Sequence, residues 1–201
     1  MNALIKINLQ ELLNQAQPVA VELGCGQNKM PGCIGIDIID LPEVDIVADL
    51  ECGLPFFPDN SVDVFYAFHF LEHIDHLAQL MRDIHRALKP DGRLILRVPH
   101  FSNPFFYSDF THKRFFGLYS FDYFSRSPRF KRRLPRNYVD FSFRTQDLKL
   151  IFYSDRLPIK ICRKVVQHIV NSSRALQEIY EELWSRWIPC SEIYAVLTPQ
   201  K

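Results

Sequence analysis

The sequence lacks the features that define membrane-spanning, secreted and disulfide-stabilised proteins. No apolar run reaches the roughly 18 residues needed to cross a bilayer. The first twenty residues have no basic start followed by an apolar core, so we expect no secretory signal. The five cysteines form no Cys-x-x-Cys pair and are odd in number, which indicates free thiols and neither a disulfide frame nor a zinc site. We therefore expect a cytoplasmic protein.

The sequence also lacks an excess of charge of either sign. Lys and Arg number 24 against 23 Asp and Glu, which gives a formal net charge of +1. Such a balance gives no general reason to expect binding to nucleic acid or to an acidic membrane. With 201 residues, of which 47% are hydrophobic, the chain can bury one sizeable core. We predict one domain over residues 1–201, with an aromatic and basic insertion at about 100–137.

Several short segments have the composition of strands that are buried on both faces. Each is almost continuously apolar and rich in β-branched residues. These segments are residues 19–23, 33–37, 44–48, 62–66 and 93–98. Alternating residues around 138–153 and an apolar run at 193–197 predict strands near the end of the chain. Strands that alternate with helical or loop connections predict a doubly wound α/β sheet.

Apolar spacing predicts helices between and around these strands. Residues 3–15 are typical of a short amphipathic helix that Pro18 ends, and residues 75–88 carry apolar side chains on one helical face. A further helical stretch begins at about residue 161 and is interrupted near Asn171, where Ser172 could cap a second helix.

The most informative motif is Val-Glu-Leu-Gly-Cys-Gly at residues 21–26. Glycines at the tip of a strand let the backbone approach a ligand closely. The carboxyl ends of strands are where α/β sheets bind ligands. A dinucleotide-binding fingerprint would need a third glycine, and Lys29 stands there instead. The missing glycine argues against a nicotinamide-dependent oxidoreductase, which stays an alternative.

Two acidic residues follow the next two predicted strands. Asp37 ends the second strand, where a carboxylate can accept hydrogen bonds from both ribose hydroxyls. Asp49 follows the third strand, where its side chain and a backbone amide could contact an adenine edge. Polar groups at three neighbouring strand ends predict a nucleoside-containing ligand.

These motifs together resemble class I S-adenosylmethionine-dependent methyltransferases, and most closely the group called methyltransferase type 11. The resemblance rests on the glycine motif, on both acidic strand ends and on the segments at 55–64, 68–73 and 88–94. It covers roughly residues 18–100. It implies a Rossmann-like, mostly parallel sheet of seven strands in the order 3-2-1-4-5-7-6 with the last strand antiparallel.

The resemblance also implies S-adenosylmethionine as the cofactor and assigns residues to its parts. Gly24, Cys25 and Gly26 would pass under the methionine moiety, and Glu22 would orient that loop or the ligand's amino group. The ribose, adenine and strand-four contacts would come from Asp37, Ile38, Asp49, Leu50, Ala67 and Phe68. The sequence departs from the family in one respect, because residues 27–32 leave room only for a turn where a full helix is usual.

Three histidines are candidates for the methyl-transfer step. His69 follows the fourth strand, His100 ends the fifth, and His112 lies in the insertion within a stretch similar to one in many relatives. A general base is needed only for a neutral hydroxyl or a protonated amine. His69 and His73 also have a helical metal-ligand spacing. The sequence shows no third ligand and the resembled family needs no metal, so we expect none.

The nature of the methyl acceptor is open, and we favour a small molecule or a glycan. Residues 126–136 contain six basic residues in eleven, which indicates a solvated loop or an anion-binding edge. Such an edge would suit a methyltransferase acting on nucleic acid or protein, but the nearly neutral overall charge argues against nucleic acid as a partner. A methyltransferase-like binding module without activity is a further alternative, because of the short first crossover. The oligomeric state is not indicated.

Overall fold

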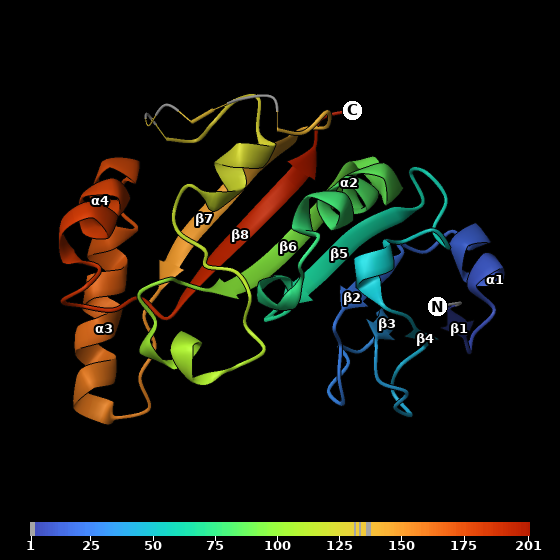
Figure 1. Cartoon of the computed structure of the whole chain (residues 1–201), viewed down its shortest axis with the longest axis horizontal. Helices are drawn as coiled ribbons and strands as arrows, with labels where there is room; N and C mark the ends of the chain where they lie inside the picture. The colour runs from blue at the N-terminus through green and yellow to red at the C-terminus, as the bar shows by residue number, and fades with distance from the viewer. Residues whose placement is uncertain (1–2, 131, 133, 136–137) are drawn as a thin grey trace.

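One mixed sheet runs through the chain and positions every strand end discussed below (Figure 1). The computed structural model describes residues 3–130, 132, 134–135 and 138–201. Its eight strands lie in the order β1-β4-β3-β2-β5-β6-β8-β7. Their bounds are β1 Leu4–Ile5, β2 Ala20–Leu23, β3 Ile34–Asp37, β4 Ile46–Val47, β5 Val62–Phe68, β6 Leu88–Pro99, β7 Phe143–Ile151 and β8 Glu192–Pro199.

The predicted fold class is confirmed. From β4 to β7 the strands follow the order that the resemblance implied, with parallel pairing from β4 through β3, β2 and β5 to β6. The last strand, β8, is antiparallel to both of its neighbours. The number of strands is eight and not the seven that the resemblance implied, because β1 pairs antiparallel with β4 at the edge of the sheet.

The predicted helix over residues 3–15 was wrong in its first half. Leu4 and Ile5 form β1, and the Lys6 N–H donates to the Asp45 carbonyl at 2.9 Å. The exposed edge of β4 offers unpaired backbone groups, and these outweigh a local helical periodicity. Helix α1 spans Leu9–Asn14, and the side chain of Asn8 caps it by accepting from the Glu11 N–H.

The helices otherwise agree with the predicted pattern. Helix α2 spans Leu77–Ala87 and buries Leu77, Leu80, Met81 and Ile84 against the sheet. Leu88 belongs to β6, so the predicted helix ends one residue early. Helices α3 (Leu157–Val170) and α4 (Arg174–Ile179) follow β7 and continue into a π-helical turn, η5, at Tyr180–Trp184. Ser173, not Ser172, caps α4 by accepting from the Leu176 N–H at 3.2 Å.

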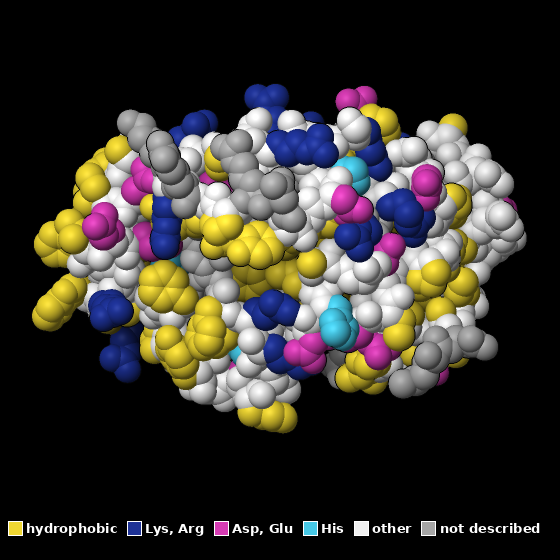
Figure 2. Space-filling model, turned by 45° about the horizontal axis from the view of Figure 1, so that its top comes forward, with side chains coloured by type: hydrophobic (Ala, Val, Ile, Leu, Met, Phe, Trp, Pro, Cys, Tyr) yellow, Lys and Arg dark blue, Asp and Glu magenta, His cyan; other side chains and the backbone are white. Residues whose placement is uncertain are grey.

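Helices α3 and α4 lie beside β7 at one end of the molecule and leave apolar side chains exposed. Figure 2 shows hydrophobic side chains gathered over this end. The exposed apolar side chains of α3, of η5 and of the residues after η5 include Leu157, Ile161, Val165, Ile169, Trp184 and Trp187. No helix among the described residues is long and apolar enough to cross a membrane.

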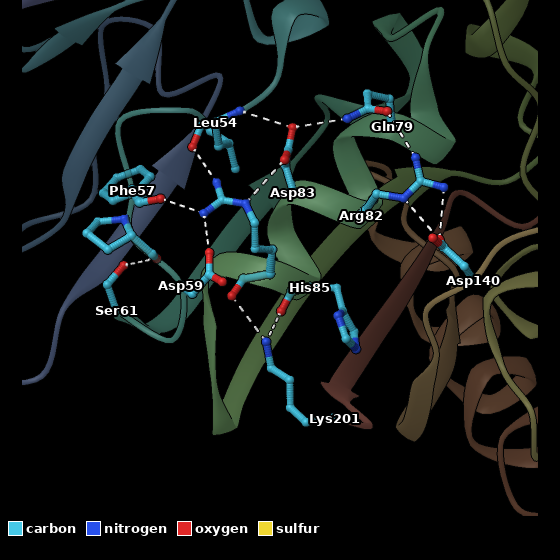
Figure 3. Close-up of polar contacts among 12 residues, drawn as sticks. Leu54, Phe57, Asp59, Ser61, Gln79, Arg82, Asp83, His85, Asp140 and Lys201 are labelled. Carbon is cyan, nitrogen blue, oxygen red and sulfur yellow. Dashed lines mark hydrogen bonds and ion pairs between the residues drawn. The ribbon is translucent and has the colours of Figure 1, made fainter.

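The end of α2 is fixed by polar contacts to the loop before β5 (Figure 3). The guanidinium of Arg86 donates to the carbonyls of Leu54 and Phe57 and to a carboxylate oxygen of Asp59, each at 2.8 Å. Lys201 donates to the carbonyls of His85 and Arg86. A cation at this position also compensates the partial negative charge at the helix C-terminus.

Asp63 joins the start of β2 to the start of β6. One of its carboxylate oxygens accepts from the Val19 N–H and from Lys89 Nζ, both at 2.7 Å. Burial alone would raise the pKa of Asp63, but these two hydrogen bonds and the charge of Lys89 outweigh it and lower that pKa.

We expect Asp63→Asn to lower the free energy of unfolding by about 1 kcal/mol at neutral pH, since the pair is partly exposed to solvent. A carboxylate with a lowered folded-state pKa stabilises the protein above its unfolded pKa, near 3.9, and this contribution disappears as the pH falls through the folded value. Urea unfolding at several acidic pH values should therefore show wild type and variant converging. A difference that persists at the acid end would contradict this account.

Candidate functional site

The glycine motif forms a tight turn at the carboxyl end of β2. Gly24 has φ +67° and Gly26 has φ +53°, both in the left-handed region. The N–H groups of Gly24 and Cys25 donate to the Ile36 carbonyl at 2.8 and 3.1 Å, which joins the turn to β3. A Cβ on Gly24 would lie 2.5 Å from Cδ2 of Phe70. The turn therefore needs glycine at residue 24 for both its backbone conformation and the space beside it.

Asp37 lies beside this turn at the end of β3. Its Oδ2 accepts from the Gly26 N–H and its Oδ1 from the Ile39 N–H, each at 2.9 Å. A carboxylate offers about four acceptor positions, so both oxygens keep capacity for further donors. Asp37 is half-buried, whereas Ile38 is exposed. The structure thus places the predicted ribose-binding carboxylate next to the predicted methionine-binding loop.

The short connection from β2 to β3 is held by two ionic side chains in place of a helix. Buried Glu22 accepts from the Met30 N–H through Oε2 at 2.6 Å. Lys29 forms an ion pair with Asp45 at 2.7 Å, and its alkyl chain crosses β3 so closely that a Cβ on Gly35 would lie 2.5 Å from Cδ of Lys29. As predicted, no helix forms here, and the partial positive charge of a helix N-terminus is missing from this site.

The thiol of Cys25 is a poor nucleophile in this position. Burial, followed by the nearby charges of Asp37 and Glu22, raises the pKa of Cys25 to about 11. With this raised pKa, the side chain of Cys25 stays a neutral thiol near pH 7. Because the thiolate is the reactive form, Cys25 is a poor nucleophile. Its contribution to the turn is therefore its backbone.

The remaining predicted cofactor residues lie at the same edge of the sheet. Asp49 follows β4 and accepts from the Glu51 N–H at 3.0 Å. It thereby caps a short 3-10 turn, η1 (Leu50–Cys52), in which Leu50 is buried. In β5, Ala67 pairs with Leu23 of β2 directly before the glycine turn, and half-buried Phe68 comes next.

His69 has a strained backbone and lies between two carboxylates. Its φ is +52°, which is uncommon for a residue with a Cβ and occurs often at functional positions. Nε2 lies 3.2 Å from Glu192 Oε1, and Nδ1 lies 3.6 Å from Glu72 Oε1. The carboxylate of Glu192, and after it that of Glu72, favours the charged ring and raises the pKa of His69 to about 9.

His100, which directly follows β6, is held by buried contacts of its own. Its ring is fully buried and packs against the tilted ring of Phe101 at a centroid distance of 4.4 Å. Nδ1 accepts from the Ser102 N–H at 3.1 Å, and Nε2 donates to Glu181 Oε2 at 3.1 Å. Both ring nitrogens are therefore engaged inside the protein, and the contact to Glu181 ties the end of β6 to η5.

His112 comes from the insertion and lies against the segment that follows β5. Its ring lies between Phe106 and His73, with centroid distances of 4.7 and 4.9 Å. Nε2 is 4.0 Å from Oε1 of Glu72, which is fully buried. The structure therefore brings His69, Glu72, His73 and His112 together.

The sequence singled out His73 only for its spacing from His69, and it gave no role to Glu72. The spacing of His69 and His73 pointed to this segment, but no helix forms between them, since only a 3-10 turn, η2, spans Leu71–His73. The partner residue, His112, is distant in the sequence and belongs to an irregular segment whose course no periodicity reveals.

Comparisons with known proteins agree with this geometry. The family described as a methyltransferase domain matches residues 21–96, which run from β2 into β6. The predicted resemblance to class I S-adenosylmethionine-dependent methyltransferases is therefore confirmed over the part that carries the strand ends. A search of curated proteins finds no match.

Solved structures show the same fold over nearly the whole chain. A SAM-dependent methyltransferase from Archaeoglobus fulgidus is 16% identical with a TM-score of 0.52, over 95% of this chain and 90% of that one. A chain in a Haloferax volcanii complex between the Trm112 methyltransferase activator and a methyltransferase is 14% identical with a TM-score of 0.52, over 96% of this chain and 88% of that one. A Haemonchus contortus phosphoethanolamine N-methyltransferase in complex with S-adenosyl-L-methionine gives 12% and 0.50, over 96% and 51%. Such low identities establish the fold alone.

Proposed function

We propose that this protein is an S-adenosylmethionine-dependent methyltransferase that acts on a small-molecule or glycan acceptor. One observation carries the proposal: in a class I methyltransferase fold, the carboxylate that ends β3 is hydrogen-bonded to the glycine turn that ends β2. Strand ends that meet at one edge of a parallel sheet are where such folds bind nucleoside ligands.

The other strand-end residues supply the remaining contacts that the proposal needs. The methionine part would lie along the turn of Gly24, Cys25 and Gly26, which Glu22 supports through the following loop. The ribose would lie at Asp37 and Ile38. The adenine would lie near Asp49, Leu50, Ala67 and Phe68, which follow or end the neighbouring strands.

The protein's own share of the chemistry is to position the acceptor and exclude water. The cofactor supplies a methyl group on a sulfonium, which is already activated for in-line displacement. His69 and His112 are the candidates for contacts with the acceptor, because both lie beside the segment that follows β5. We leave His100 out of this role, because its ring is buried and both nitrogens are engaged.

The first half of the insertion supports a small acceptor with an apolar or ring-shaped part. Residues 101–116 run along the edge where β5 and β6 end (Figure 1). The aromatic side chains that they leave exposed are Phe105, Tyr107, Phe110 and Phe115. Exposed aromatic rings around a strand-end site are typical of small-molecule binding.

The second half of the insertion lines a hollow that is separate from the predicted cofactor residues. The hollow has a volume of about 880 Å³ and is lined by residues that include Phe124, Arg126, Phe130, Arg132 and Phe141 and by none of the predicted cofactor residues. Of the basic run at 126–136, the residues Lys131, Arg133 and Arg136 lie outside the described part of the chain. A nucleic acid or protein acceptor stays the alternative that this run would serve.

We also propose a cytoplasmic location, which the five free cysteines support.

Calorimetric titration with S-adenosylmethionine, S-adenosylhomocysteine and NADH tests the proposal. We expect micromolar binding of the two sulfur compounds and none of NADH. Asp37→Asn keeps the side-chain shape but removes the charge and one acceptor oxygen, so S-adenosylhomocysteine should bind at least about tenfold more weakly. The matched control is Asp40→Asn, because exposed Asp40 pairs with Lys6 away from the glycine turn.

The outcomes separate this proposal from its alternatives. Binding of NADH would favour the oxidoreductase. Absence of binding by a folded sample would favour a methyltransferase-like module without activity, for which the short, helix-free β2–β3 connection is the supporting observation. Equal affinity of wild type and Asp37→Asn would show that the ligand binds elsewhere.

A further inference from the structure

Three metal-ligating side chains converge where the insertion meets the segment after β5. Glu72 and His73 come from η2, and His112 comes from the insertion. One ligand atom from each lies within 4.8 Å of the others. Imidazole and carboxylate are the groups that bind divalent transition metals in proteins.

The first observation that points to a cation site is the environment of Glu72. Its side chain is fully buried, and neither carboxylate oxygen has a hydrogen-bond partner among the described residues. Two imidazole nitrogens lie near Oε1, His69 Nδ1 at 3.6 Å and His112 Nε2 at 4.0 Å, both beyond ordinary hydrogen-bond length. A buried carboxylate is costly unless a cation or hydrogen-bond donors compensate it.

The second sign is the orientation of the two imidazole rings. His112 Nδ1 lies 3.0 Å from the Phe106 carbonyl. His73 Nδ1 lies 3.0 Å from the Thr111 hydroxyl and 3.3 Å from the Thr111 carbonyl. The Thr111 hydroxyl donates its own hydrogen to Asp109 Oδ1, so toward His73 it accepts. A carbonyl can only accept, so each Nδ1 carries the hydrogen and donates. Each Nε2 is then left with a lone pair in the neutral ring. Metal-binding histidines are held in this way, with the other ring nitrogen donating to a carbonyl or carboxylate.

We propose that Glu72, His73 and His112 bind a divalent transition metal ion such as zinc. Two ligand atoms at about 2.1 Å from a tetrahedral zinc ion lie about 3.4 Å apart, so side-chain shifts on the order of 1 Å would close the site. Three protein ligands leave at least one position open, which is the pattern of catalytic zinc sites and not of structural ones. Asp109 Oδ2, which is 3.5 Å from His112 Nε2, is the next oxygen in reach.

The open position would receive a water molecule or an oxygen atom of the methyl acceptor, and this last step rests on the proposed methyltransferase function. A metal ion lowers the pKa of a bound hydroxyl and orients it. Such an ion would help to deprotonate the acceptor hydroxyl, which is the task that the sequence analysis assigned to a histidine base. The competing account is a metal-free cluster in which an imidazolium compensates Glu72.

Titration of the chelator-treated, cofactor-free protein with Co²⁺ and Zn²⁺ tests the site. We expect one Co²⁺ per chain with micromolar or tighter affinity, a visible absorption band typical of a four- or five-coordinate Co²⁺ ion, and its displacement by Zn²⁺. Glu72→Gln and His112→Gln should each weaken binding by at least about tenfold to a hundredfold. His168→Gln is the matched control, because His168 is exposed on α3 outside the cluster.

Two further readouts keep the outcome unambiguous. Circular dichroism in the presence of chelator should show both cluster variants folded, since Glu72→Gln removes an uncompensated buried charge. Titration with S-adenosylhomocysteine, done separately, reports the cofactor site and can fail or succeed independently of the metal. The proposal is overturned by the absence of one-to-one Co²⁺ binding, or by binding that Glu72→Gln and His112→Gln leave unchanged.

Discussion

Gly24→Ala is expected to reduce the affinity for S-adenosylhomocysteine by about 100-fold or more, equivalent to about 2.7 kcal/mol. The new Cβ would lie 2.5 Å from Cδ2 of Phe70, so either the ring or the turn must move. The left-handed backbone of Gly24, with φ +67°, adds a cost of about 1–2 kcal/mol for any residue with a Cβ. Displacement of the turn removes the surface along which the methionine part would lie.

Gly32→Ala is the matched control for this effect. Gly32 also has a positive φ, +79°, but a Cβ there meets no atom within 4 Å. Both variants therefore carry the same kind of backbone strain, and only one disturbs the turn. Calorimetry should show nearly unchanged binding for Gly32→Ala. Equal losses of affinity in the two variants would mean that general destabilisation, and not the turn at Gly24, controls binding.

Glu181→Ala is expected to lower the free energy of unfolding by about 2–4 kcal/mol. The Glu181 carboxylate accepts from the ring of His100 at 3.1 Å and from the Leu118 N–H at 2.8 and 3.0 Å. Removing it leaves two buried donors without partners, at about 1–3 kcal/mol each. The same contacts join β6, the insertion and η5, so the loss affects three segments together.

The adjacent residue provides the control for that measurement. Glu182 is exposed and lies in the same π-helical turn, so Glu182→Ala removes a similar side chain without breaking the buried network. Urea unfolding should place Glu182→Ala within about 0.5 kcal/mol of wild type. Similar free energies of unfolding for the two variants would contradict the claim that the contacts of Glu181 with His100 and Leu118 stabilise the fold.

The core of the fold was predictable because its signals are local. The strands that became β2, β3, β5 and β6 are short apolar runs, and the helix that became α2 has an apolar stripe. The glycine turn and Asp37 were predictable for the same reason, since each directly follows a strand. The edge strand β1 was not, because Leu4 and Ile5 fit a helical pattern and only the free edge of β4 makes them extended.

The candidate metal cluster depends on contacts that no local pattern contains. His112 reaches Glu72 and His73 only because the irregular segment after β6 returns across the end of β5. The spacing of His69 and His73 pointed to this segment, but it could not show that the ring of His69 lies between Glu192 and Glu72. The role of Lys29 was equally hidden, since its partner Asp45 lies in the next crossover.

The crystal structure of the protein with S-adenosylhomocysteine is the most direct test of the cofactor site. We predict ribose hydroxyls within hydrogen-bond distance of the Asp37 carboxylate, the amino acid part along Gly24 to Gly26, and the adenine beside Asp49 and Leu50. A ligand bound at any other place, or no ligand at saturating concentration, would contradict the proposal that these strand ends form the methyl-donor site.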